Sequence, residues 1–137
     1  MRTAYLLDTN AVIAVLNGDA TVRQRLRNAM KSGDIFISSV ALFELWYGVA
    51  RSARRAENTE RLRVFLSGAV GHIPFDEDDA AIAGDIRFAL ESTGTPIGPF
   101  DLLIAAQALR MGATLVTANV GEFSRVQGLV WENWKAA

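Results

Sequence analysis

Short apolar runs alternate with longer segments of helical character along almost the whole of this chain, and this order limits the folds that it can adopt. The apolar runs that we expect to form buried strands are residues 4–7, 34–38, 73–75, 114–117 and 129–131. The segments with helical spacing of apolar residues, or with capping residues at their ends, are residues 11–16, 20–31, 40–55, 57–67, 78–91 and 101–111. Strands that alternate with helices predict an α/β fold in which a central, mostly parallel sheet is covered by helices on both faces.

The size and composition of the chain narrow the protein class. A length of 137 residues is enough for one well-formed core, so we expect residues 1–137 to form a single domain. The hydrophobic content of 50% and the charged content of 21% exclude a disordered, solvating chain. The absence of cysteine excludes disulfides, thiolate metal sites and a cysteine nucleophile. No apolar run approaches the roughly 20 residues that span a bilayer, and no signal-peptide pattern is present, so we expect a cytoplasmic protein without a membrane segment.

Four acidic residues interrupt or border segments that are otherwise apolar. They are Asp8, Glu44, Asp101 and Glu122. Ionised carboxylates beside apolar residues are unfavourable unless a cation gathers them. If the fold brings them together, they form an oxygen-rich pocket of the kind that Mg²⁺ and Mn²⁺ prefer. Such a pocket suits the hydrolysis of phosphodiester bonds.

The order of these residues along the chain agrees with a shared pocket. Asp8 comes directly after the first predicted strand, and Asn119 and Glu122 follow the strand at 114–117. Asp101 lies in the first turn of the helix that leads into that strand. Sites in parallel sheets form at the carboxyl ends of the strands, near the point where the strand order reverses. We therefore expect the acidic residues to meet at this edge of the sheet.

Each carboxylate also has an ordinary structural interpretation. Asp8 could form only an Asx-turn at the end of a strand, Asp101 could be a favourable charge at a helix N-terminus, and Glu122 could be a solvated surface acid. Glu44 is harder to explain in this way, because the residues one helical turn before and after it are Val40 and Gly48 and offer no ion pair. A charge on so apolar a helix needs a partner from outside the helix.

Four segments in order along the chain resemble the signature segments of PIN-domain ribonucleases, specifically the VapC toxins of type II toxin–antitoxin systems. They are LLDTN at 6–10, FELWYG at 43–48, GPFD at 98–101 and VTANVGEF at 116–123. The resemblance implies a PIN-like, Rossmann-like three-layer α/β/α fold and an endoribonuclease that depends on Mg²⁺ or Mn²⁺. It also implies cleavage that leaves a 3′-hydroxyl and a 5′-phosphate. The GPFD form is similar to the branch that cleaves initiator tRNA in its anticodon loop.

The resemblance assigns roles to particular residues of this chain. The acidic positions of the family match Asp8, Glu44 and Asp101, and the fourth position falls on Asn119 or on Glu122. We expect Asp8 and Asp101 to bind the metal directly, and Glu44 and Glu122 to complete the ligand set or to align the attacking water. We expect two further side chains to donate hydrogen bonds to these ligands. They are Asn10 and Thr117.

The partners expected from the resemblance are a cognate VapB-type antitoxin, an RNA substrate that is a tRNA, and a second copy of the chain. DNA would be bound only indirectly, through the antitoxin complex. The helix at 40–50 is apolar over more than a single stripe, which favours an apolar surface around Phe43 and Trp46 that the antitoxin covers.

Two alternatives remain open from the sequence. A haloacid-dehalogenase-like phosphohydrolase also places Asp at the end of its first strand, but it needs a second Asp where Asn10 stands and a suitably placed Lys. A non-catalytic PIN-like module would bind RNA or a protein partner without cleaving RNA. Filled acidic positions disfavour the second alternative without excluding it.

Overall fold

The computed structural model describes residues 2–135. The strands are β1 (Thr3–Leu7), β2 (Gly33–Ser38), β3 (Val70–Ile73), β4 (Thr114–Val116) and β5 (Trp131–Glu132). The helices are α1 (Thr9–Leu16), α2 (Ala20–Ser32), α3 (Ser39–Ala50), α4 (Arg55–Leu66), α5 (Glu77–Ser92), α6 (Pro99–Met111) and α7 (Val120–Phe123). The predicted alternation of strands and helices is confirmed.

The strands form one sheet in the order β3-β2-β1-β4-β5, and every neighbouring pair in it is parallel. The chain builds outward from β1 to β3 and then returns to place β4 on the other side of β1. The strand order therefore reverses between β1 and β4, which is where ligand sites form in open parallel sheets. Asp8 lies directly beyond β1 at this point, and its backbone N–H donates to the carbonyl of Val116 at 3.1 Å.

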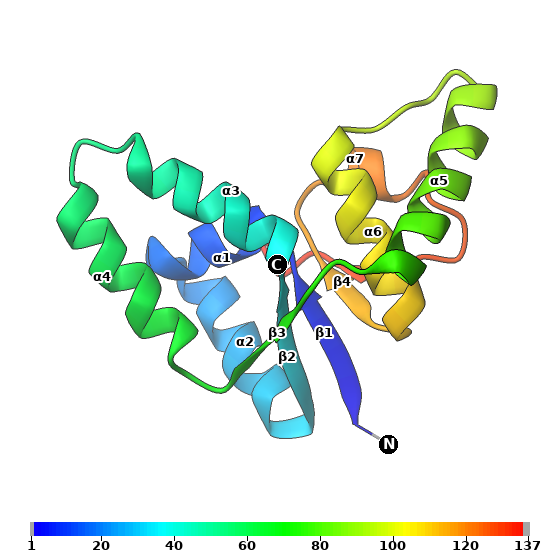
Figure 1. The fold of residues 1–137 in the computed structure, drawn as a ribbon. Helices are drawn as coiled ribbons and strands as arrows, with labels where there is room; N and C mark the ends of the chain where they lie inside the picture. The colour runs from blue at the N-terminus through cyan, green and yellow to red at the C-terminus, as the bar shows by residue number, and fades with distance from the viewer. Residues whose placement is uncertain (1, 136–137) are drawn as a thin grey trace.

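Helices cover both faces of the sheet (Figure 1). Figure 1 shows α1, α2, α3 and α4 on one side of the strands and α5, α6 and α7 on the other, with α3 starting at the upper end of the sheet. The predicted three-layer α/β/α arrangement is therefore confirmed. Of the strands, β1, β2 and β4 have the most fully buried side chains, including Leu6, Ile37 and Leu115, each at 0% exposure.

The apolar residues of helix α3 form one surface in the core and another exposed to solvent, as their periodicity predicts. Leu45 is buried, and Leu42, Trp46 and Val49 pack against the same core. Phe43 and Tyr47 face outward, with 57% and 60% of their surface exposed. Trp46 is half-buried and packs against the core, so the exposed part of the apolar surface expected around Phe43 and Trp46 is formed by Phe43 and Tyr47.

Several element boundaries differ from the predicted ones for local reasons. The third strand is Val70–Ile73 and not 73–75, because its pairing with β2 runs from Ile35–Val70 to Ser38–Ile73. Pro74, which follows, has no N–H to donate to a strand ladder. The last strand is Trp131–Glu132 and not 129–131.

Helices α1, α4 and α6 each begin two residues earlier than predicted, α3 ends earlier, and α7 was not predicted. Asp8 caps α1 where Thr9 or Asn10 was expected, and α6 starts at Pro99 because proline fits the first turn of a helix. Helix α3 ends at Ala50, with Arg51 as its C-cap, and not near residue 55. Helix α7 is too short to show apolar periodicity. None of the helices in residues 2–135 has the length and apolar character needed to cross a membrane.

Candidate active site

Asp8 is held at the carboxyl end of β1 with only 3% of its surface exposed. Its Oδ1 accepts a hydrogen bond from the backbone N–H of Ala11 at 2.7 Å, so it also caps α1. Burial is the largest influence on this group and raises the pKa of Asp8, while the Thr117 hydroxyl and the Ala11 N–H act in the opposite direction. Asp8 therefore does cap α1. It is also a buried carboxylate at the end of the strand where a site is expected.

Glu44 extends from α3 toward the same end of the sheet and finds its partner on another helix. The hydroxyl of Thr9, the first residue of α1, donates to Glu44 Oε1 at 2.7 Å. Thr9 was not predicted as a site residue, although it stands next to Asp8 in the polar segment after the first strand. This bond fixes one oxygen of Glu44 close to the segment that carries Asp8.

Asp101 and Glu122 are joined by the side-chain amide of Asn119. The Nδ2 atom of Asn119 lies 2.6 Å from Glu122 Oε2 and 3.3 Å from Asp101 Oδ2. Glu122 Oε1 also accepts from the backbone N–H of Gly98 at 3.0 Å, which ties α7 to the segment that opens α6. A Cβ added at Gly98 would lie 3.4 Å from Asp101 Oδ2, so a side chain there would crowd the carboxylates. Asn119 and Glu122, between which the sequence could not choose, therefore act together.

The charges of these groups are coupled. The pKa of Asp101 is raised from 3.8 to about 7, first by burial, then by its hydrogen bond with Glu122, and then by the negative charges of Glu122, Asp8 and Glu44. The pKa of Glu122 is lowered, chiefly by its hydrogen bond with Asp101, so Asp101 is the member of this pair that binds a proton more readily. Since Asp101 is influenced by all three other carboxylates, the four groups face one electrostatic site.

The donor set fits a hard divalent cation in its chemistry, because it consists of carboxylate and amide oxygens whose negative charges repel one another. As they stand, however, no three acidic or histidine side chains in residues 2–135 lie close enough together to hold one ion. The binding of one ion by Asp8, Glu44, Asp101 and Glu122 therefore stays a prediction, and it requires these side chains to move closer together than they lie here. Asn119 holds two of the acids to each other, and Thr9 and Ala11 hold the other two on separate hydrogen bonds.

The two residues expected to support the acids lie in different environments. Thr117 is buried, accepts a hydrogen bond from the backbone N–H of Asn119 at 2.9 Å, and lowers the pKa of Asp8 through its hydroxyl. Asn10 is exposed and lies in the wall of a neighbouring cavity that also includes Asn119 and Lys135. Asn10 thus borders the acidic site, and within residues 2–135 its amide forms no hydrogen bond to the carboxylates.

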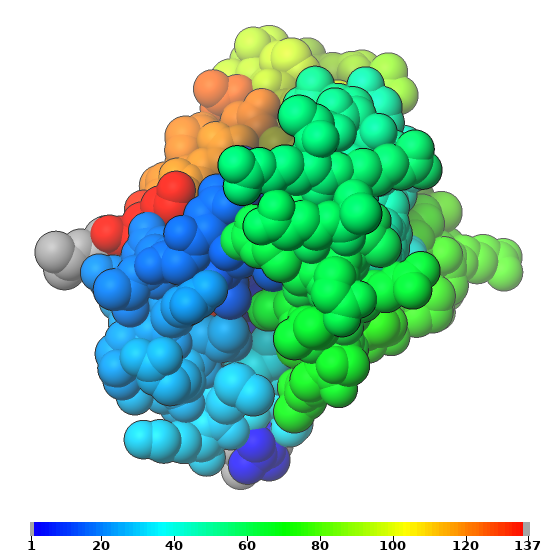
Figure 2. Space-filling view, turned by 90° about the vertical axis from the view of Figure 1, so that its left-hand side faces the viewer, coloured from blue at the N-terminus to red at the C-terminus, as the bar shows by residue number. Residues whose placement is uncertain are grey.

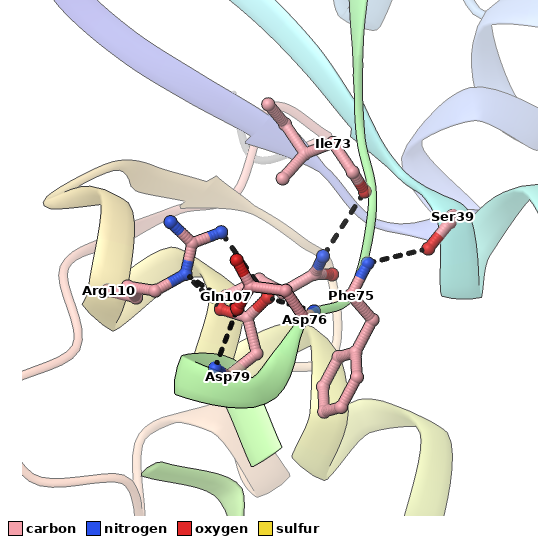
Figure 3. Close-up of polar contacts among 7 residues, drawn as sticks. All are labelled: Ser39, Ile73, Phe75, Asp76, Asp79, Gln107 and Arg110. Carbon is pink, nitrogen blue, oxygen red and sulfur yellow. Dashed lines mark hydrogen bonds and ion pairs between the residues drawn. The ribbon is translucent and has the colours of Figure 1, made fainter. Parts of the chain in front are cut away.

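A second group of charged residues holds α6 in place away from the acids (Figure 3). Asp79 on α5 has 0% exposure and is paired with the guanidinium of Arg110 on α6. The Nε of Arg110 also lies 3.7 Å from Asp76, and the amide of Gln107 donates to the carbonyl of Ile73 at 3.2 Å. These contacts fix α6 against α5 and the end of β3. The position of Asp101 at the other end of α6 depends on them.

The sequence is similar to a known family of domains and to known ribonucleases. The PIN domain family model matches residues 5–129. The chain is 40% identical over 131 residues to ribonuclease VapC2 of Rickettsia felis, covering 95% of this chain and 97% of that protein. It is also 40% identical over 134 residues to the tRNA(fMet)-specific endonuclease VapC of Shigella flexneri, with the same coverage.

A solved structure is similar over nearly its whole length. The structure of VapBC2 from Rickettsia felis bound to a DNA fragment of its promoter has a TM-score of 0.91 and 38% sequence identity to this chain. The match covers 96% of this chain and 99% of that one. Nucleases with PIN domains generally use a divalent metal ion.

Proposed function

This chain belongs to the PIN-domain family of VapC ribonucleases, and on that premise we propose that its acidic site is the active centre of an Mg²⁺- or Mn²⁺-dependent endoribonuclease toxin. The observation that carries the assignment is the joining of Asp101 and Glu122 through the amide of Asn119 beside Asp8, where burial and then the neighbouring carboxylates raise the pKa of Asp101 to about 7. A site that holds four acids against their own repulsion is suited to a cation. The haloacid-dehalogenase-like alternative is wrong, since the family match covers residues 5–129.

In the proposed mechanism each acid has a different role, which is set by its position in the fold. Asp8, at the strand end, and Asp101, at the helix start, would hold the ion directly. Glu44 would orient the attacking water and accept its proton, with Thr9 fixing the Oε1 atom of Glu44 so that Oε2 stays free for this role. Glu122 and Asn119 would complete the site and set the orientation of Asp101. Bound Mg²⁺ or Mn²⁺ would supply positive charge for the phosphoryl oxygens and lower the pKa of a water.

We propose that the RNA substrate is a tRNA, and initiator tRNA in particular. The support is the name of the relative from Shigella flexneri, a tRNA(fMet)-specific endonuclease, with which this chain shares 40% identity. Cytoplasmic location and a single domain over residues 1–137 stay predictions from the sequence.

The antitoxin partner is proposed from a surface as well as from the relatives. An apolar groove of about 620 Å³ runs between α2 and α4, on the face that Figure 2 presents. Its floor is apolar and its rim is charged, which suits an amphipathic helix. The residues that line it are Val15, Leu16, Arg23, Leu26, Arg27, Met30, Glu57, Glu60, Arg61, Val64 and Phe65.

This groove leads toward the acidic site. Leu16 and Arg61 also line a second cavity of about 240 Å³, and Glu44 forms part of the wall of that cavity. A partner helix in the groove could therefore continue through the second cavity and bring a cationic side chain to the acids. Such a side chain would compete with metal and substrate.

The groove assignment can be tested by capture of the antitoxin with variants of the tagged chain. Val64, 62% exposed in the groove, and Phe88, 76% exposed on α5, form a matched pair. Val64→Glu should weaken capture while Phe88→Glu should not. Equal capture by both variants would contradict the assignment.

We propose that the exposed surface around Phe43, which was expected from the sequence to bind the antitoxin, instead joins two copies of the chain in a homodimer. Phe43 on α3 and Phe100 on α6 are 57% and 42% exposed, and their ring centroids lie 5.5 Å apart. Tyr47, at 60% exposure, extends this aromatic patch along α3. Exposed aromatic clusters of this kind are enriched at protein interfaces. Sedimentation of wild-type protein and Phe43→Glu would test whether the patch joins two copies.

The function itself is tested by incubating the purified protein with total tRNA in Mg²⁺, in Mn²⁺ and in EDTA. We expect discrete cleavage products with either metal and none in EDTA, with initiator tRNA cut preferentially. A protein that binds tRNA but cuts none under any condition would be the non-catalytic PIN-like module that the sequence left open.

A further inference from the structure

A polar cavity of about 610 Å³ lies directly beside the acidic site. Asn119, whose amide joins Asp101 to Glu122, is also part of the cavity wall, so the two spaces share a side chain. The other lining residues are Asn10, Ile13, Ala14, Asn17, Gly18, Asp19, Ala118 and Lys135. A volume of this size is in the range of pockets that bind small organic ligands and is ample for one nucleotide.

The polar groups of this cavity suit a nucleotide. Within residues 2–135, the side-chain amides of Asn10 and Asn17 take part in no hydrogen bond, and an amide can both donate to and accept from the edge of a base. Asp19 is the acidic member of the wall, and its Oδ1 is already engaged with the N–H of Val22 at 3.1 Å, where it caps α2. Ile13 and Ala14 supply apolar surface against which a base can pack.

Lys135 gives the cavity its positive charge. Its side chain is exposed and forms no ion pair with any residue in the described part of the chain. It lies close enough to Asp8 for its charge to favour the ionised carboxylate. A site of four acids repels the phosphates of RNA, so a cation at its edge is needed to hold the backbone near the scissile bond. The chain has only one other lysine, Lys31, which is exposed in the last turn of α2.

We propose that Lys135 and this cavity form a substrate subsite, in which the ammonium group pairs with a phosphate next to the scissile one and the cavity receives the attached nucleotide. The proposal rests on the proposed ribonuclease function. It makes Lys135 a positioning residue, because it binds the substrate without contacting the reacting atoms.

The test measures the binding of a fluorescein-labelled, single-stranded RNA of ten nucleotides by fluorescence anisotropy. EDTA is present so that no cleavage occurs. Wild-type protein is compared with Lys135→Gln, Lys135→Arg and the matched control Lys31→Gln, at several salt concentrations. Thermal melts establish that each variant is folded. Lys135→Gln should bind roughly tenfold more weakly at low salt. The slope of log affinity against log salt should fall by about 0.7, as expected when one phosphate contact on a single strand is lost.

The other variants separate the two parts of the subsite. Lys135→Arg should restore affinity and slope, and Lys31→Gln should match wild type. Asn17→Ala removes a neutral amide from the cavity, so it should weaken binding about 2- to 10-fold without changing the salt slope. With Mg²⁺ present, Lys135→Gln should raise KM for RNA and leave kcat nearly unchanged.

Equal RNA affinity and equal salt slope for Lys135→Gln and Lys31→Gln would overturn the proposal. So would a Lys135→Gln protein that binds RNA normally but loses affinity for the antitoxin, since the cavity would then be a protein-binding site. RNA binding that depends on Lys135, in a protein that cuts no RNA with any metal, would instead uphold the subsite and contradict the proposed function.

Discussion

Replacing Asp101 with asparagine should stabilise the metal-free protein, and the gain should depend on pH in a defined way. The folded-state pKa of Asp101, about 7, lies above its ordinary value of 3.8. The folded protein therefore holds a proton that the unfolded chain has lost between these pH values. Stability contributed by the wild-type carboxyl group consequently falls as pH rises from about 4 to 7 and is constant above that window.

The size of the effect follows from the same shift. A rise of the pKa from 3.8 to about 7 corresponds to about 4 kcal/mol if the full interaction is counted. Asp101 is only partly buried, so solvent screening reduces the expected value to about 1–2 kcal/mol. The asparagine side chain of the variant carries no charge at any pH and avoids this loss. The variant should therefore equal wild type near pH 4 and exceed it by this amount at pH 8.

The assay is urea unfolding in EDTA at pH 4, 5, 6, 7 and 8. Asp85→Asn is the matched control, since Asp85 is exposed on α5, away from the acidic site. The difference between Asp101→Asn and wild type should grow across the window, while the Asp85→Asn difference stays flat. An Asp101→Asn protein that is less stable than wild type at pH 8, or a difference that does not change with pH, would refute the coupling of the four acids.

Three further predictions concern the site and its support. Asp8→Asn should abolish RNA cleavage while circular dichroism shows a folded protein; a purified variant with full activity would remove Asp8 from the site. Mg²⁺ at about ten times its Kd should raise the Tm of the wild-type protein by about 3–5 °C, because an ion bound only by the folded state stabilises that state. The rise in Tm should be smaller in Asp101→Asn. No change in Tm at any Mg²⁺ concentration would contradict metal binding. Asp79→Ala leaves Arg110 without its buried partner and should lower the free energy of unfolding, measured in urea, by about 3 kcal/mol. Asp78→Ala, at an exposed neighbouring position, should lower it little. Equal losses in the two variants would show that the buried pair is not what fixes α5 to α6.

The sheet could be predicted because its strands are short apolar runs separated by helices, a pattern that admits few arrangements. Asp8 and Asn119 could be placed at one edge because parallel strands end together and the order reverses between β1 and β4. These inferences need only local patterns and the general rules of parallel sheets.

What could not be predicted depends on contacts between distant segments. The hydrogen bond from Thr9 to Glu44 joins residues 35 positions apart, and a single sequence has no marker for it. The ion pair of Asp79 with Arg110 joins two helices in the same way. Lys135 borders the acids only because the C-terminal segment returns beside β4, which composition cannot show. The distances between the carboxylates likewise depend on the hydrogen bonds that each side chain forms with distant segments.

The central claim is that the four acids form a metal-dependent ribonuclease site, and the rate of tRNA cleavage as a function of Mg²⁺ tests it most directly. Wild-type protein should show no cleavage in EDTA, a rate that rises with Mg²⁺ to saturation, and recovery when Mg²⁺ is added back after EDTA. Asp101→Asn should remain nearly inactive even at saturating Mg²⁺, while Asp85→Asn should follow wild type. Cleavage that continues undiminished in EDTA, or Asp101→Asn activity equal to that of wild type, would contradict the account.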